Sequence, residues 1–92
     1  MDEGRELQLP PAVKLAEEAT EIARIWLVAD RQHVVLPRTL WNDPAAWGLM
    51  LADLARHVAK AYAAQGHSSS EVLERIRQGF DAEWASPTEL PE

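Results

Sequence analysis

The side chains best suited to proton transfer or metal binding in this sequence are its three histidines: His33, His57 and His67. Asp53 and His57 are four residues apart, a spacing that places both on one side of a helix, where they could share a metal ion. No third ligand follows at a suitable spacing, and Arg56 and Lys60 flank the pair and would repel a cation. A solvated ion pair is therefore the favoured interpretation of Asp53 and His57.

The remaining polar residues do not form a catalytic pattern either. His33 lies on a predicted strand without an identifiable nucleophile, and His67 lies between two predicted helices. Helix capping explains the serines at 68–70. The neighbouring Glu17 and Glu18 lie in an exposed, charged segment that gives no reason for perturbed acidity. We expect no catalytic residue, no metal site and no bound cofactor, and the sequence favours a protein that is not an enzyme.

Length, charge and composition narrow the classes of function. The chain has 92 residues, one domain's length, and no cysteine, which excludes disulfides and thiolate chemistry. Its net charge is −6, with the acids concentrated at both ends and no basic face for nucleic acid. It has no export-signal pattern and no stretch near the ~18 consecutive apolar residues of a membrane span. We expect an acidic cytoplasmic protein that binds neither nucleic acid nor membrane.

The predicted fold class is α+β, with an N-terminal β-hairpin followed by two α-helices packed on the sheet. Residues 1–20 are expected to form a lead-in segment, residues 21–86 a single domain and residues 87–92 a tail. Within the lead-in, alternation at Leu7–Leu9 allows a third, edge strand, and Val13–Ala19 allows a short helix.

Two runs rich in β-branched and aromatic residues, 21–29 and 33–36, predict the strands of the hairpin. Pro37 ends the second run. The polar step Asp30–Arg31 is interpreted as a two-residue loop. Because this step lacks the glycine that tight hairpin turns favour, the sequence leaves the turn type open.

With this loop, both faces of the predicted hairpin are apolar. One face sets Leu27 opposite Val34 and Ile25 opposite Leu36. The other carries the candidate interface residues Arg24, Trp26, Val28, His33 and Val35. A sheet backed by helices on one side normally shows polar residues on the other, and an isolated hairpin is marginal in water. We predict a homodimer that joins two hairpins into a four-stranded sheet; alternatively, residues 5–20 of the same chain cover this face.

The first helix is predicted to run from Ala45 to Gln65. Asp43 is a good N-cap, and Pro44 suits the first helical position. Trp41 is the expected apolar lid over the start of the helix, and Gly66 supplies the stop.

The first helix carries two apolar stripes, and the second helix carries one. Large side chains form the stripe expected to be core: Trp47, Met50, Leu51, Leu54, Val58, Ala61 and Tyr62. Small side chains form the stripe expected to accept the second helix or a partner chain: Gly48, Ala52, Ala55, Ala59 and Ala63. The second helix opens at the capping box Ser68–Glu71, ends near Ala85 and has one apolar arc: Val72, Leu73, Ile76, Phe80 and Trp84.

Four stretches of the chain are similar to a known family: Leu40–Gly48, Leu51–Ala59, Glu71–Arg77 and Phe80–Trp84. They resemble a family of small bacterial proteins known as domain of unknown function 5076 (DUF5076), and the similarity extends from about Glu21 to Thr88. The resemblance implies a bacterial source. It implies no activity, so no catalytic residue is carried over.

The sequence favours a non-enzymatic interaction or regulatory module that forms a homodimer through the hairpin and could bind a further, unidentified protein. The alternative is a small-ligand-binding protein or minor enzyme with a pocket between the hairpin and the first helix, with Arg24, His33 or His57 at its rim. DNA binding through the helices is less favoured, because the second helix is acidic.

Overall fold

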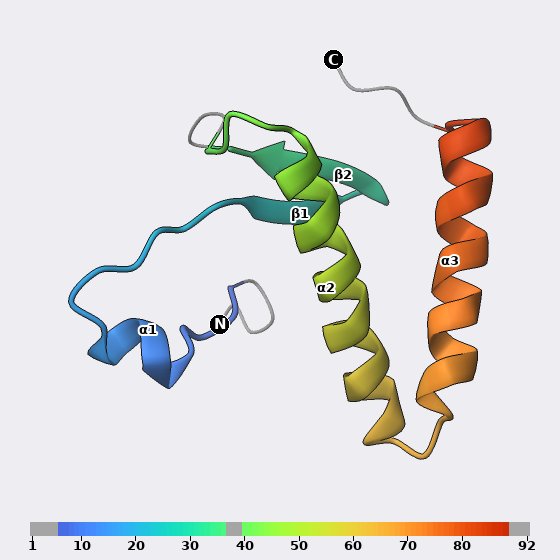
Figure 1. Ribbon diagram of the computed structural model, residues 1–92, viewed down its shortest axis with the longest axis horizontal. Coiled ribbons are helices and arrows are strands. Elements are labelled where there is room, and N and C mark those ends of the chain that lie inside the picture. Colours follow the sequence, from blue (N-terminus) through green and yellow to red (C-terminus); the bar gives the residue numbers. More distant parts are fainter. Residues whose placement is uncertain (1–5, 37–39, 89–92) are drawn as a thin grey trace. The chain divides into compact units, whose positions relative to one another are not determined.

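The computed structural model describes residues 6–36 and 40–88. Its elements are α1 (Pro11–Leu15), β1 (Arg24–Val28), β2 (Arg31–Val35), α2 (Ala45–Ala63) and α3 (Ser69–Ala85), as Figure 1 shows. The chain divides into two compact units, Met1–Leu40 and Trp41–Glu92. A β-hairpin followed by two long helices confirms the predicted α+β class.

The leading segment contains the short helix that the sequence allowed, at Pro11–Leu15 instead of Val13–Ala19, but not the strand that the sequence allowed at Leu7–Leu9. Residues 7–10 have no regular secondary structure, and the sheet formed by the described residues has two strands. Pro10 precedes helix α1 and Pro11 occupies its first turn. Proline fixes φ near the helical value and needs no partner for a backbone N–H at this position. The two prolines therefore start a helix instead of ending a strand.

The hairpin turns at Ala29–Asp30, one residue earlier than predicted. Both residues have positive φ, 53° at Ala29 and 65° at Asp30, and Val28 pairs with Arg31 across them. Two successive left-handed residues are the signature of a type I′ turn, whose twist matches that of the strands. The predicted loop, Asp30–Arg31, is therefore wrong: the backbone adopts this turn without glycine.

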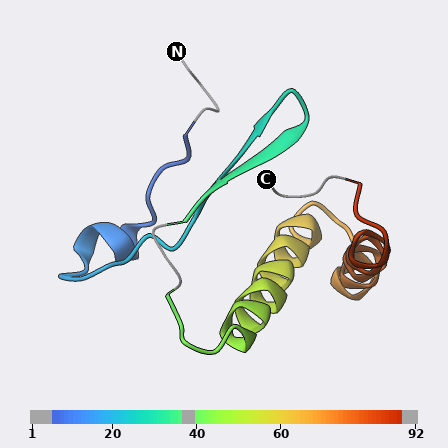
Figure 2. The same cartoon turned by 90° about the horizontal axis from the view of Figure 1, so that it is seen from above.

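The register consequently differs from the predicted one by two residues. Leu27 pairs with Gln32 instead of Val34, and Ile25 pairs with Val34 instead of Leu36. Side chains alternate between the faces of a strand, so a slip of two residues keeps every side chain on its face. The predicted division of the hairpin into two faces therefore survives the error in pairing. Figure 2 shows the two paired strands and the turn that joins them.

Helix α2 starts as the sequence predicted. The Asp43 carboxylate Oδ1 accepts a hydrogen bond from the Ala45 backbone N–H at 3.0 Å, and Pro44 lies between them. The rings of Trp41 and Trp47 meet edge to face, with centroids 5.0 Å apart and planes at 75°. The cap and the apolar lid together fix the chain direction at the helix start.

Gly66 ends the helical path of α2, as predicted. The Gly66 N–H donates to the Ala63 carbonyl at 3.0 Å, and the His67 N–H donates to the Tyr62 carbonyl at 3.3 Å. Gly66 has φ of +100°, a conformation that L side chains rarely adopt, and the pattern is a Schellman motif. The His67 ring also meets the Tyr62 ring edge to face at 5.5 Å. His67, which lacked an evident role in the sequence, therefore takes part in the turn.

Helix α3 begins and ends where the sequence indicated. The Ser68 hydroxyl accepts a hydrogen bond from the Glu71 N–H at 3.4 Å, and the helix runs to Ala85. Beyond it, the Glu83 carboxylate accepts hydrogen bonds from the backbone N–H and hydroxyl of Thr88 at 2.8 and 3.0 Å. Glu83 thus holds the chain that leaves the helix.

The two long helices contact each other through the small-residue stripe of α2. Ala59 is 1% exposed, and Ala55 and Ala63, four residues to either side, are half-buried. Small side chains permit this close approach. The stripe of large residues that the sequence assigned to the core stays mostly exposed, including Leu51, Leu54, Val58 and Tyr62. Within the helical unit α3 leaves these four side chains uncovered, because it packs on the neighbouring face of α2, and their place in a core stays a prediction.

Candidate interaction surface

Six side chains share one face of the hairpin, which we call the Trp26 face: Arg24, Trp26, Val28, Arg31, His33 and Val35. They share it because alternate residues on a strand, and residues paired across strands, point the same way. All five predicted interface residues lie there, and Arg31 joins them because it belongs to β2, not to the loop. Their role as an interface stays a prediction.

The Trp26 face is open, and so is the reverse face of the hairpin. Every residue of β1 and β2 is exposed, including Trp26 at 38%. The reverse face carries Ile25, Leu27, Gln32 and Val34, of which three are apolar. Within its own unit, the hairpin thus presents apolar side chains on both sides and neither side is covered.

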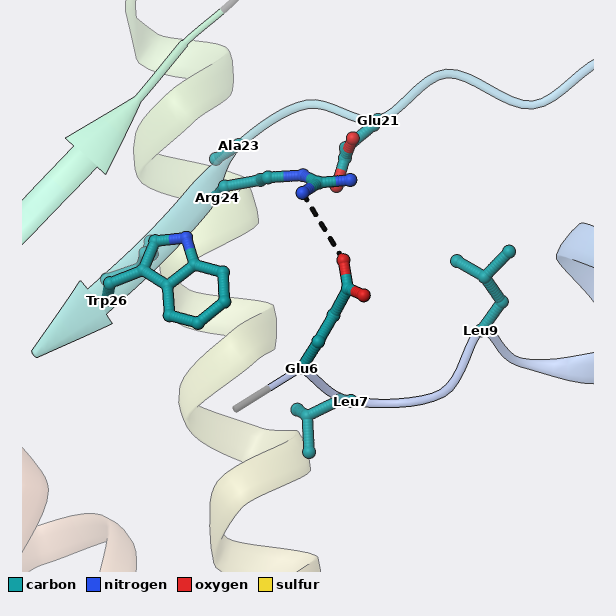
Figure 3. A pocket seen from close by; sticks show the side chains of 8 residues that line it. Glu6, Leu7, Leu9, Glu21, Ala23, Arg24 and Trp26 are labelled. Atoms are coloured by element: carbon teal, nitrogen blue, oxygen red, sulfur yellow. Dashed lines mark hydrogen bonds and ion pairs between the residues drawn. The ribbon is translucent and has the colours of Figure 1, made fainter. Parts of the chain in front are cut away.

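Arg24 connects the Trp26 face to the segments before it. Its Nε donates to Glu21 Oε2 at 2.7 Å, and its Nη1 donates to Glu6 Oε2 at 3.3 Å (Figure 3). The hydrogen bond to Glu21 and the negative charges of Glu21 and Glu6 raise the pKa of the Arg24 guanidinium. The guanidinium is therefore already engaged by two carboxylates.

An open hollow of about 220 Å³ lies beside β1. Leu7 and Leu9 of the leading segment line it together with Arg24, Ile25 and Trp26 of β1 (Figure 3). The sequence left open whether residues 5–20 cover this surface. The leading segment does reach the hollow, but Trp26 retains its 38% exposure.

The hollow contains charge but no catalytic arrangement among the residues that line it. Glu6 and Glu21 both interact with Arg24, so these groups neutralise one another instead of converging on a reacting atom. Across residues 6–36 and 40–88, no three histidine or carboxylate side chains are grouped closely enough to hold a metal ion. Within those same residues, no helix is both long and apolar enough to cross a membrane.

The histidines lie on separate elements. His33 is on β2, His57 is on α2 and His67 follows the end of α2. The Asp53 carboxylate, which the sequence paired with His57, accepts a hydrogen bond from Arg56 Nη1 at 3.3 Å. The solvated ion pair expected at Asp53 therefore has Arg56 as a partner.

Sequence reasoning did not identify Glu6 and Glu21 as neighbours of Arg24. Glu21 is three residues from Arg24, but Glu6 is 18 residues away. A pair at that separation leaves no periodic signal in a single sequence. The one available hint was an acidic lead-in followed by an isolated arginine at the first residue of a strand.

Comparison with known proteins identifies the family. A family model described as Domain of unknown function (DUF5076) matches residues 6–88, which is most of the chain. The chain belongs to DUF5076. This confirms the resemblance seen in the sequence. No curated protein matches the chain.

A solved structure supports the same fold for this DUF5076 protein. It comes from the photosynthetic bacterium Rhodopseudomonas palustrus and is described as that of "a putative pyruvate dehydrogenase". Its sequence is 34% identical, the match covers 100% of this chain and 95% of that one, and the TM-score is 0.73. The activity in that description is that protein's, and the DUF5076 description itself assigns none.

Proposed function

We propose that this DUF5076 protein is a non-enzymatic interaction module of the bacterial cytoplasm, and that two copies join through their β1–β2 hairpins. One observation carries the proposal: every residue of both strands is exposed, although both faces of the hairpin carry large apolar side chains. An isolated two-stranded sheet is marginal in water, and exposed apolar strand edges invite pairing. A second hairpin supplies the missing strands.

A second copy of this chain fits the hairpin better than an unrelated partner does. Closed twofold pairing is the commonest form of protein association, and it uses the same surface on both subunits. Edge-to-edge pairing of two hairpins gives one four-stranded sheet and satisfies the outward N–H and C=O groups of the joined strands. An antiparallel joined sheet would place the two Trp26 faces on one side, where Trp26 and Val28 are neighbours along β1.

The test is the mass in solution of the full chain and of Trp26→Lys, measured by sedimentation equilibrium. We expect a dimer for the wild type and about 30-fold or greater weakening for Trp26→Lys, the effect of losing a central aromatic anchor. Gln32→Lys is the matched control, because it adds the same charge to the reverse face of the hairpin. Far-UV circular dichroism checks that both variants fold.

Two results would contradict the proposal. One is a wild-type chain that sediments as a single copy at about 0.1 mM, well above the Kd of typical specific complexes. The other is a Trp26→Lys dimer as tight as that of Gln32→Lys. Acrylamide quenching of the wild type compared with Trp26→Phe then shows whether the Trp26 indole is sheltered within one chain.

The hollow beside β1 supports a second candidate function, the binding of a small anionic ligand. Arginine is the best anchor for a carboxylate, and Arg24 lines the hollow next to Trp26. A ligand would have to displace Glu6 from the guanidinium, so only weak binding is expected. A thermal-shift screen of small carboxylates tests this function, and Arg24→Ala should abolish any stabilisation. A shift that survives Arg24→Ala would place the ligand elsewhere.

A further inference from the structure

One side of helix α3 carries four exposed side chains and the half-buried Leu73, which together we call the α3 stripe: Leu73, Arg77, Phe80, Asp81 and Trp84. Spacings of three and four residues place these side chains on one side of the helix. Phe80 is 48% exposed and Trp84 is 77% exposed. Their rings stack on each other at 5.5 Å with 19° between the planes. A stacked aromatic pair left this open to water is unusual for a surface that binds nothing.

The α3 stripe carries one positive and one negative side chain, Arg77 and Asp81, which pair with each other. Arg77 Nε donates to both carboxylate oxygens of Asp81, at 3.0 and 3.1 Å. These opposite charges lie four residues apart, on either side of Phe80. Turning the helix end for end exchanges the positive position with the negative one. The stripe is therefore complementary to a reversed copy of itself.

We propose that the α3 stripe is a self-association surface that packs antiparallel against the α3 stripe of a second copy. The register that sets Arg77 opposite the partner's Asp81 also sets Asp81 opposite the partner's Arg77, because the contact is twofold. The same register brings Trp84 beside the partner's Leu73. Each copy thus supplies one aromatic end, one aliphatic end and both charges. The contact needs no other component.

The exposed areas indicate a weak, reversible contact. The open parts of Phe80 and Trp84 amount to roughly 300 Å² per copy, given that such side chains bury 150–250 Å² each. Two copies therefore contribute roughly 600 Å², about half of the ~1,200 Å² at which stable specific interfaces begin. The half-buried Leu73 and the stem of Arg77 add a smaller area, so the contact stays below the size of a stable interface. We expect association in the range of tens of micromolar, weaker than a typical obligate dimer.

Charge reversal with rescue tests the proposal in the full chain. Arg77→Asp sets like charges opposite each other twice in the twofold contact, and so does Asp81→Arg. Each single variant should weaken the α3 contact about tenfold or more, as like-charge juxtaposition does. The double variant Arg77→Asp/Asp81→Arg restores opposite charges across the twofold and should recover most of the association. Sedimentation velocity over a concentration series measures all three.

Two further variants separate the contact from effects on folding. Arg75→Asp makes the same charge change on the other side of α3, where Arg75 donates to Gln78 at 2.8 Å, and should leave association unchanged. Trp84→Gln removes the aromatic end without altering charge and should weaken association. The proposal is overturned if Arg75→Asp disrupts association as strongly as Arg77→Asp, or if the double variant is no better than the singles. Single variants that associate as the wild type does would show that this chain's own segments cover the stripe, and would equally overturn it.

This surface does not depend on the pairing of hairpins, and the same experiments keep the two apart. If both contacts form, the wild-type hairpin dimer associates further at concentrations above the Kd of the α3 contact. Trp26→Lys and Arg77→Asp then each leave a dimer, and the variant that combines them is a monomer. Loss of association in Arg77→Asp but not in Trp26→Lys would support the α3 contact and contradict the hairpin dimer. Loss of association in Trp26→Lys but not in Arg77→Asp would contradict the α3 contact and support the hairpin dimer.

Discussion

The α2–α3 pair and the β1–β2 hairpin differ in how far each is completed by its own residues. In the helical pair, Asp43 and Ser68 cap the two helix starts, Gly66 turns the chain between them, and Ala59 is buried where the helices meet. In the hairpin, every strand residue is exposed, and the turn uses left-handed residues without glycine.

The difference shows which backbone hydrogen bonds can be satisfied by residues that are close in the sequence. A helix satisfies its backbone groups within one segment, and short capping motifs satisfy its ends. A strand satisfies half of its backbone groups only by pairing with a further strand. The helical pair therefore satisfies most of its backbone groups with its own residues, whereas the outer edges of the two-stranded hairpin keep N–H and C=O groups without a strand partner.

Overpacking the contact between the helices should give the largest loss of stability. Ala59→Leu adds three carbons where the side chain is 1% exposed, and should cost about 1–3 kcal/mol of unfolding free energy. Ala61→Leu adds the same volume to an exposed position of α2 and should change stability by no more than about 0.5 kcal/mol. Urea unfolding followed by circular dichroism at 222 nm compares them. Equal stability of the two variants would show that the helices do not meet at Ala59.

The same glycine-to-alanine change should have opposite effects at two positions of the helical unit. Gly66 has φ of +100°, so Gly66→Ala should cost about 1–2 kcal/mol. Gly79 lies within α3, where an added methyl group would meet open space, so Gly79→Ala should gain about 0.5–1 kcal/mol. Thermal unfolding of both variants measures the difference. Changes of the same sign would contradict the assigned end of α2.

Removing the backbone strain of the turn should stabilise the hairpin and so reduce the difference in stability between the hairpin and the helices. Ala29 has φ of 53°, and Ala29→Gly should stabilise the hairpin by about 0.5–1 kcal/mol after the added flexibility of glycine is subtracted. Ala23→Gly makes the same change before β1, where φ is not positive, and should destabilise. Hydrogen exchange at the amides of residues 24–35 reports both effects. Slower exchange in Ala23→Gly than in Ala29→Gly would refute the type I′ turn.

The ion pair between Glu6 and Arg24 should have the smallest effect. Both side chains are largely exposed, so Glu6→Gln should speed proteolytic cleavage within residues 6–20 only about twofold, and added salt should do the same. Glu17→Gln, a carboxylate that does not line the hollow, is the control. No change in cleavage with Glu6→Gln would show that the pair does not hold the leading segment.

The contribution of Arg24 should not vary with pH across the working range. Its pKa is raised in the folded protein, so the stabilisation it brings is fully present below the ordinary arginine pKa. That stabilisation is lost only as the pH rises through the raised value. Protection of the leading segment should therefore be insensitive to Arg24 titration from about pH 6 to about pH 9.

The helix boundaries were readable from the sequence because each depends on neighbouring residues. Asp43 caps an N–H two residues ahead, Ser68 caps one three residues ahead, and Gly66 adopts a backbone conformation that its own lack of a side chain allows. The composition of the Trp26 face was also readable, since alternation along a strand survives a slip of two residues. Family membership followed from motifs in the helices.

The features that could not be predicted from the sequence depend either on residues that are distant in the chain or on residues that adopt an unfavourable backbone conformation. Ala29 and Asp30 adopt left-handed conformations without the glycine that would have marked the turn. Helix α2 has two apolar stripes, and periodicity alone does not show that α3 packs on the small one that includes Ala59. The contact between Glu6 and Arg24 spans 18 residues and has no sequence motif.

The two-residue length of the hairpin turn has a consequence for how this protein can vary in evolution. Point substitutions at Ala29 or Asp30 leave the alternation of β2 intact, whereas, unless the turn takes up the extra residue as a three-residue loop, a single inserted residue inverts it. Gln32 and Val34 would then exchange sides with His33 and Val35, and the surface around Trp26 would be rebuilt in one step. Insertions and deletions at this position should therefore be rarer among homologues than changes of residue type.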